Sequence, residues 1–175
     1  MKKLIMALLL GLGSTSAAIA DEMAIDLLKG EGDVTGIRLA YRPYHSTITD
    51  LPLVGDASLY LELSANKWRY GDPAEYDDNL AIALSPVLTR QFATLNGKPL
   101  YWEFGIGVSF LDKKRFAGKN LGSYYQFEDR LGLTLALDPA KKRSLSLRYF
   151  HYSNGGLEKP NPGMDFLNLS YAWRF

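Results

Sequence analysis

The chain has 175 residues, of which 47% are hydrophobic and 13% aromatic, and its formal net charge is +1 at pH 7. A nearly neutral chain has no basic surplus of the kind that binds nucleic acid. It contains no cysteine, which excludes disulfides and thiolate metal sites. No other residue pattern predicts a metal site or a cofactor.

The first twenty residues have the features of a secretory signal peptide. Two lysines precede an apolar run over 4–12, and Ala18-Ile19-Ala20 has the small-residue pattern of a cleavage site. The apolar run is too short to span a membrane as a helix. Cleavage leaves 175 − 20 = 155 residues with 18 Lys and Arg against 19 Asp and Glu. We expect one exported domain over 21–175.

Beyond residue 20 the hydrophobic pattern has a period of two. From Leu100 to Phe110 every second residue is large and apolar, and those between them are Tyr, Glu, Gly, Gly and Ser. Such alternation is typical of a half-buried strand, and strands of about ten residues span a membrane as a barrel. We predict strands over 23–30, 34–43, 57–68, 79–92, 99–110, 124–137, 144–153 and 164–175.

These segments predict an all-β fold, an eight-stranded antiparallel transmembrane outer-membrane β-barrel with both termini in the periplasm. Pro86 cannot donate to a strand ladder and predicts a bulge or bend in the fourth segment. Residues 69–78, 111–123 and 154–163 become outer loops, and 44–56 is a long connection on the periplasmic side. The chain ends in Tyr171-Ala-Trp173-Arg-Phe175, which resembles the assembly signal of outer-membrane barrels.

Charged residues gather at two kinds of position. Lumen-facing parity predicts an internal salt-bridge network of Arg38, Arg42, Glu62 and Glu103. The third outer loop carries Lys113, Lys114, Arg115 and Lys119. That second group could meet lipid phosphates or simply be solvated.

Polar side chains with lipid-facing parity stand at the ends of the last two predicted strands. Counting by twos from Leu145, Leu147 and Tyr149 leads to His151 and Ser153, and counting back from Phe175 leads to Asp165. Adjacent strands lie about 4.8 Å apart, so all three converge at the outer rim.

Three such residues have the chemistry of nucleophilic acyl transfer. In this interpretation Ser153 is the nucleophile, His151 the general base and then acid, and Asp165 the orienting acid. Asn154 and the backbone of Gly155-Gly156 follow directly and could donate to an oxyanion. The alternative is a turn and a polar rim without catalysis.

A resemblance to a known family rests on His151-Tyr-Ser153-Asn154-Gly-Gly156, on Lys159-Pro-Asn161-Pro-Gly163 and on the aromatic last strand. This motif resembles the lipid A 3-O-deacylase (PagL) family of outer-membrane enzymes. The resemblance implies a serine esterase that removes the 3-hydroxyacyl chain at position 3 of the proximal glucosamine of lipid A.

By the same resemblance, His151 and Ser153 match the family histidine and nucleophile, and Asn154 and the Gly156 amide match its oxyanion donors. Asp165 stands where the best-known members carry glutamate, and Glu158 in the loop is the alternative acid. The implied substrate is lipid A, or lipopolysaccharide, in the outer leaflet, and a homodimer is allowed. Two alternatives are a non-catalytic barrel and an outer-membrane phospholipase with the same Ser/His/acid site.

Overall fold

The computed structural model describes residues 18–72 and 75–175, with side chains from residue 21 onward. The predicted leader over 1–20 lies outside the described residues, apart from the backbone of 18–20. No helix in the described part is long and apolar enough to cross a membrane.

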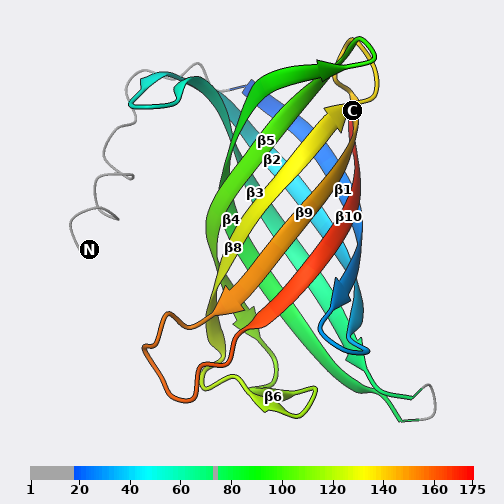
Figure 1. The fold of residues 1–175 in the computed structure, drawn as a ribbon, viewed down its shortest axis with the longest axis vertical. Coiled ribbons are helices and arrows are strands. Elements are labelled where there is room, and N and C mark those ends of the chain that lie inside the picture. The colour runs from blue at the N-terminus through cyan, green and yellow to red at the C-terminus, as the bar shows by residue number, and fades with distance from the viewer. Residues whose placement is uncertain (1–17, 73–74) are drawn as a thin grey trace.

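Eight strands close into one antiparallel barrel, as the alternation predicts (Figure 1). Their bounds are β1 (Ala18–Gly30), β2 (Thr35–Leu51), β3 (Gly55–Tyr70), β4 (Asp77–Leu95), β5 (Lys98–Leu111), β8 (Tyr125–Ala136), β9 (Arg143–Ser153) and β10 (Met164–Arg174). Around the wall they follow the order β1-β10-β9-β8-β5-β4-β3-β2. A separate short hairpin, β6 (Arg115–Phe116) and β7 (Lys119–Asn120), lies between β5 and β8.

The two ends of the barrel differ. One end, here called the terminal end, is where β1 begins and β10 finishes (Figure 1). The other, the loop end, carries the β1–β2, β3–β4, β5–β8 and β9–β10 connections. The β9–β10 connection over 154–163 is therefore beside the β6–β7 hairpin at the loop end (Figure 1).

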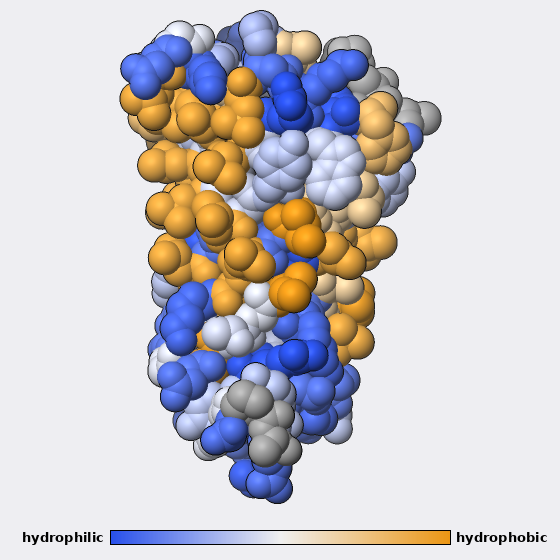
Figure 2. All heavy atoms as spheres, turned by 90° about the vertical axis from the view of Figure 1, so that its right-hand side faces the viewer, coloured by the Kyte–Doolittle hydropathy of each residue, from blue (hydrophilic) through white to orange (hydrophobic). Residues whose placement is uncertain are grey.

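The outer wall is apolar because the pleat sends every second side chain outward. Leu27 and Leu131 are each 60% exposed, and Phe110 is 58% exposed. Figure 2 shows a band of hydrophobic residues across the middle of one wall, with hydrophilic residues toward both ends. Exposed apolar area of this extent needs a lipid environment rather than water.

Charged side chains fill the barrel lumen. Arg38 lies 2.5 Å from Glu62, 3.2 Å from Asp26 and 3.3 Å from Glu128. Arg148 Nε donates to Glu103 Oε2 at 2.5 Å. The predicted internal network is confirmed, and it is larger than the four residues named from the sequence.

Aromatic side chains close the lumen at the loop end. The Trp68 ring lies 4.8 Å from that of Phe166 and 4.9 Å from that of Tyr152. Phe116 and Leu121, from the connection between β5 and β8, are buried in the same cluster. This connection folds back into the barrel mouth, so it supports whatever lies on the neighbouring β9–β10 loop.

The connection over 44–56 is a strand extension rather than a loop. β2 continues to Leu51 and β3 starts at Gly55, so a short turn joins them. The pairing register shifts between Tyr41 and Tyr44. That bulge breaks the inward–outward alternation of side chains, so a period of two did not predict the part of β2 beyond it.

Of the bulge or bend predicted at Pro86, the bulge is absent from the structure. Pro86 pairs with Leu61 in an unbroken β3–β4 register, and the irregularity of the β4–β5 pair lies between Gln91 and Ala93. The Pro86 side chain points outward and is exposed. Its missing N–H removes one hydrogen bond between strands but does not insert the extra residue that makes a bulge.

Candidate active site

His151 and Asp165 face each other across the last two strands. They are direct partners in the β9–β10 register, and His151 Nδ1 lies 2.6 Å from Asp165 Oδ1. Their side chains are 37% and 33% exposed, and the outward residues further along β9, Leu145 and Leu147, are apolar. The outward parity predicted from the sequence therefore produces a histidine–carboxylate pair on the lipid-facing wall.

Tyr149 adds a second hydrogen bond to this carboxylate. Its hydroxyl donates to Asp165 Oδ1 at 2.6 Å, from the position two residues before His151. The same oxygen thus receives two partners, which holds the carboxylate in one orientation. With the Nδ1 side of His151 directed to a carboxylate, Nε2 is the nitrogen left for a nucleophile or a substrate.

Ser153 is the last residue of β9 and follows His151 by two positions on the same face. It is half-buried and pairs with Phe127 of β8. The described hydrogen bonds include none between Ser153 and His151. Such bonds are often long in an enzyme without substrate and shorten when substrate binds.

Asn154 organises the loop that follows. Its side chain is buried, and Oδ1 accepts from the Gly156 amide at 2.9 Å. Nδ2 donates to the carbonyls of Glu158 at 3.0 Å and Leu121 at 3.3 Å. The backbone amide of Asn154 donates to Asn161 Oδ1 at 3.0 Å. Both expected oxyanion donors, Asn154 Nδ2 and the Gly156 amide, are thus engaged within the loop here.

Gly155 supplies a donor without a partner. Gly155 and Gly156 both have positive φ, 65° and 78°, which glycine adopts without the usual steric cost. Among the described hydrogen bonds the Gly155 amide has no acceptor. It is two residues after Ser153 and so is a backbone N–H that remains available to an oxyanion.

The β5–β8 connection supports this loop from the side. Gly122 has φ +80°, and a Cβ there would stand 2.3 Å from the Pro160 carbonyl oxygen. Lys119 pairs with Glu31 and also donates to the Gly163 carbonyl at 3.3 Å. Gly163 itself lies against the imidazole, because a Cβ there would be 2.8 Å from His151 Cε1.

Glu158 is apart from this pair. Its side chain is exposed, and the structure gives it no described contact with the imidazole. The carboxylate that does approach from the other side is Asp129, the β8 register partner of His151. The electrostatic interaction of Asp129 with His151 places a second acid beside the ring. Sequence reasoning missed Asp129, although Leu131, Asp129 and Phe127 share outward parity and the same count by twos would have found it.

The basic residues of the β5–β8 connection do not form one cluster. Lys113 pairs with Asp78 at 2.8 Å, Lys114 lies over the Tyr124 ring at 5.0 Å, and Lys119 is held as described above. Within residues 18–72 and 75–175, no group of three or more His, Asp and Glu side chains could hold a metal ion.

Comparison with known proteins identifies the family. The sequence profile of the lipid A 3-O-deacylase (PagL) family matches residues 35–174, which is most of the chain. The chain belongs to this family. The stretch from His151 to Gly163 lies inside the matched range.

Two family relatives carry the same name, lipid A deacylase PagL. The one from Pseudomonas aeruginosa is 34% identical over 176 residues, covering 98% of each chain. The one from Bordetella bronchiseptica is 40% identical over 121 residues, 69% of this chain. That second match spans just under two thirds (65%) of the relative's own length.

Solved structures give the same family and fold. The crystal structure of the outer membrane enzyme PagL superposes with a TM-score of 0.71 at 26% identity, covering 87% of this chain and 98% of that one. The Yersinia pestis outer membrane protein Ail has a TM-score of 0.50 at 14% identity and shares only the fold. A PagL-family barrel with an apolar belt is an integral outer-membrane protein.

Proposed function

We propose that this protein is a serine esterase that hydrolyses the 3-O-linked 3-hydroxyacyl chain of lipid A. The observation that carries the proposal is the His151–Asp165 contact of 2.6 Å on the lipid-facing wall, with Ser153 two residues further along the same face. Membership in the lipid A 3-O-deacylase family supplies the substrate.

In the proposed reaction Ser153 Oγ attacks the ester carbonyl while His151 takes the hydroxyl proton. Asp165 stabilises the imidazolium that forms, and backbone N–H groups of Gly155 and Gly156 stabilise the oxyanion. Collapse expels the sugar 3-oxygen, which takes the proton from His151. Water then attacks the acyl-serine ester with His151 as base, and the fatty acid leaves as Ser153 is restored.

For the Gly156 amide this role requires an exchange of partners, since it donates to Asn154 Oδ1 in the free protein. The Gly155 amide needs no such exchange. We therefore assign the first stabilisation of the oxyanion to Gly155, and assign Asn154 to holding the loop in place.

The filled lumen supports a reaction on the outer wall. Buried ion pairs such as Arg38–Glu62 and Arg148–Glu103 fill the barrel interior, so an acyl chain could enter only by breaking them, which would leave buried charge uncompensated. An amphiphile in the outer leaflet reaches Ser153 by lateral diffusion instead. Its acyl chains then stay in lipid while the ester meets the site at the loop end.

The decisive experiment compares Ser153→Ala with the parent protein in a bacterium that makes lipid A. Mass spectra of extracted lipid A should show loss of one 3-hydroxyacyl mass with the parent only. In purified protein, kcat should fall by at least about 10³-fold, because the nucleophile is removed.

Ser144→Ala is the matched control. Ser144 is on the same strand, nine residues earlier, about 30 Å away at the terminal end. It should retain parental activity, and both variants should keep the heat-modifiable migration of a folded barrel. Retained activity in Ser153→Ala would end the serine mechanism.

Phospholipid vesicles free of lipid A separate the remaining alternatives. Release of fatty acid from those vesicles, with lipid A left intact, would make the protein a phospholipase that uses the same residues. No release from either lipid by folded protein would make it a non-catalytic barrel.

Two further predictions concern the mature protein. Cleavage after Ala20 should give an N-terminus at Asp21, which intact-mass measurement of protein from the outer membrane tests. Sedimentation of the detergent-solubilised protein tests whether it forms a homodimer. A mass equal to that of one barrel would exclude the homodimer.

A further inference from the structure

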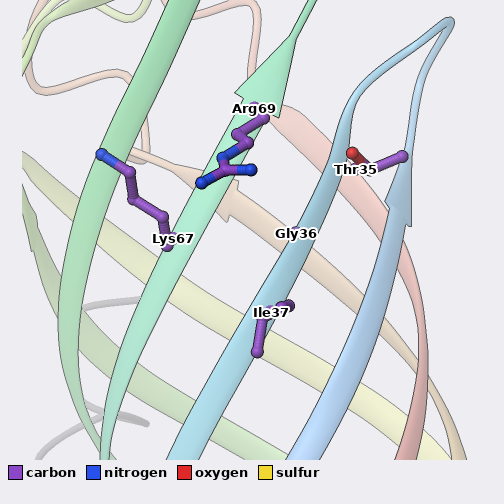
Figure 3. Close-up of a pocket in the computed structure, with 5 residues that line it drawn as sticks. All are labelled: Thr35, Gly36, Ile37, Lys67 and Arg69. Carbon is purple, nitrogen blue, oxygen red and sulfur yellow. The ribbon is translucent and has the colours of Figure 1, made fainter. Parts of the chain in front are cut away.

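A second site lies on a different part of the outer wall from the proposed triad. A cavity of about 250 Å³ opens between β2 and β3 and is lined by Thr35, Gly36, Ile37, Lys67 and Arg69 (Figure 3). We call it the β2–β3 notch. β3, which carries both cations, is four strands from β9 in either direction around the barrel, whereas β2 is two strands from β10.

The notch combines outward side chains of two neighbouring strands. Thr35 pairs with Arg69, and Ile37 pairs with Lys67, so the four lie as two adjacent cross-strand pairs. Trp68, between the two cations, points inward and is fully buried. Figure 3 shows Lys67 and Arg69 as successive side chains on the outer side of β3.

Apolar wall continues directly below the two cations. Ile37, Leu39 and Leu63 are 54%, 52% and 48% exposed on the same face. Arg69 is one residue before the end of β3, at the loop end. The notch therefore stands where the lipid-contacting wall meets the headgroup layer, at the hydrophilic loop end of the wall (Figure 2).

The charge of the notch is only partly neutralised. Lys67 and Lys113 share the single carboxylate of Asp78, at 2.5 and 2.8 Å. The Arg69 guanidinium lies over the Tyr76 ring at 5.4 Å, and no carboxylate of the described residues is within ion-pair distance of it. Asp77 and Asp112 accept hydrogen bonds from the backbone of Ala117 and Leu80, and Asp72 and Glu75 belong to the β3–β4 connection just after Arg69.

This arrangement fits a phosphate group on a lipid. A guanidinium presents a planar fork that matches two phosphate oxygens, an ammonium adds a point charge, and a threonine hydroxyl can donate. A phosphate monoester carries up to two negative charges, more than the diester of a phospholipid, and so suits two cations better. The volume accommodates a phosphate and the sugar atoms next to it, with acyl chains along Ile37 and Leu39.

We propose that the β2–β3 notch binds a phosphate of a lipid A molecule that is not the substrate. The proposal rests on the outer-membrane location and on the notch itself, and it holds whether or not Ser153 is a nucleophile. A lipid held there fixes the depth of the β2–β3 wall in the outer leaflet.

Native mass spectrometry in detergent tests the notch in a Ser153→Ala background, which prevents turnover. Adding Lys67→Ala and Arg69→Ala should weaken the binding of one lipid A per barrel by about tenfold or more, because charged hydrogen bonds are lost. Arg69→Lys alone should give a smaller loss, since the charge stays and the fork goes. The matched control is Lys142→Ala with Arg143→Ala, which removes the same charge at the terminal end and should leave binding unchanged.

The lipid itself provides the second control. Lipid A without phosphates should bind the parent and the double variant equally. Unchanged binding of phosphorylated lipid A by the folded double variant would overturn the site. Equal competition by phosphatidylglycerol would overturn the assignment to lipid A and leave a general site for lipid phosphate. Deacylation by the Lys67→Ala, Arg69→Ala variant is measured separately with Ser153 intact. Failure of the notch proposal and failure of the esterase proposal are therefore distinguishable.

Discussion

His151 stands between two carboxylates, Asp165 on β10 and Asp129 on β8, each its direct register partner. Only Asp165 is bonded to the ring, at 2.6 Å from Nδ1, and Tyr149 holds the same oxygen. Asp129 adds negative charge without a described hydrogen bond to His151. At the scale of single residues, the proposed orienting acid, Asp165, is therefore the carboxylate whose geometry is fixed by a third group.

Asp165→Asn should lower kcat for lipid A deacylation by about 10²–10⁴-fold while the barrel folds, because a neutral amide cannot stabilise the imidazolium. Asp165→Glu keeps the charge and should retain more activity than Asp165→Asn. The measurement is the initial rate of fatty acid release from lipid A micelles.

Glu158→Ala is the comparison at the same scale, since its carboxylate is exposed and lies in the loop. It should cost much less activity than Asp165→Ala. The reverse ranking would move the orienting acid from β10 into the loop.

Two connections form the site at the scale of elements. The β9–β10 loop carries the glycines after Ser153, and the β5–β8 connection holds that loop through the Leu121 carbonyl and the close approach of Gly122. Phe116 and Leu121 anchor the β5–β8 connection in the barrel mouth. The loop of the proposed site thus depends on a buried cluster that contains none of the proposed catalytic residues.

Gly122→Ala should lower kcat by about tenfold or more, because a Cβ 2.3 Å from the Pro160 oxygen displaces the loop and small displacements of reacting groups are costly. Gly118→Ala is a control with the same kind of backbone strain. Gly118 has φ +74°, yet a Cβ there meets nothing within 4 Å. Equal losses in the two variants would assign the effect to backbone strain and not to the loop contact.

At the scale of the whole molecule, the charged residues in the lumen contribute to stability, whereas the residues proposed for the chemistry lie on the apolar outer wall. Glu62 is fully buried and pairs with Arg38 at 2.5 Å, Arg130 at 2.6 Å and Arg42 at 2.7 Å. Removal of one partner from such a network leaves buried charge uncompensated. The proposed triad lies on the other side of the barrel wall and does not use these charges.

Glu62→Gln should lower the free energy of unfolding by about 3–5 kcal/mol, as for other broken buried ion pairs. Denaturant unfolding in detergent micelles, followed by tryptophan fluorescence, measures it. Activity per folded molecule should stay at the parental level. Glu158→Gln, a change of the same type in an exposed loop, should leave stability within about 0.5 kcal/mol; a similar loss there would point to net charge instead of the network.

Sequence by itself determined the features that follow from a local period of two. Alternation predicted eight strands and their outward faces, and it predicted that His151, Ser153 and Asp165 share one wall. The alternation did not predict the full length of a strand where a bulge changed the period. After Tyr41, for example, β2 continues to Leu51. Local pattern also gave no signal for contacts between distant segments.

Only the tertiary structure decided the rest, because strand register and barrel closure bring together residues far apart in the chain. Closure pairs β1 with β10, and the register between β8 and β9 puts Asp129 next to His151. Folding of the β5–β8 connection into the mouth gives Gly122 its role, and pairing of β2 with β3 makes the notch at Arg69. Side-chain parity is a property of each strand alone, whereas a neighbour across a barrel wall is fixed by the packing of the whole molecule.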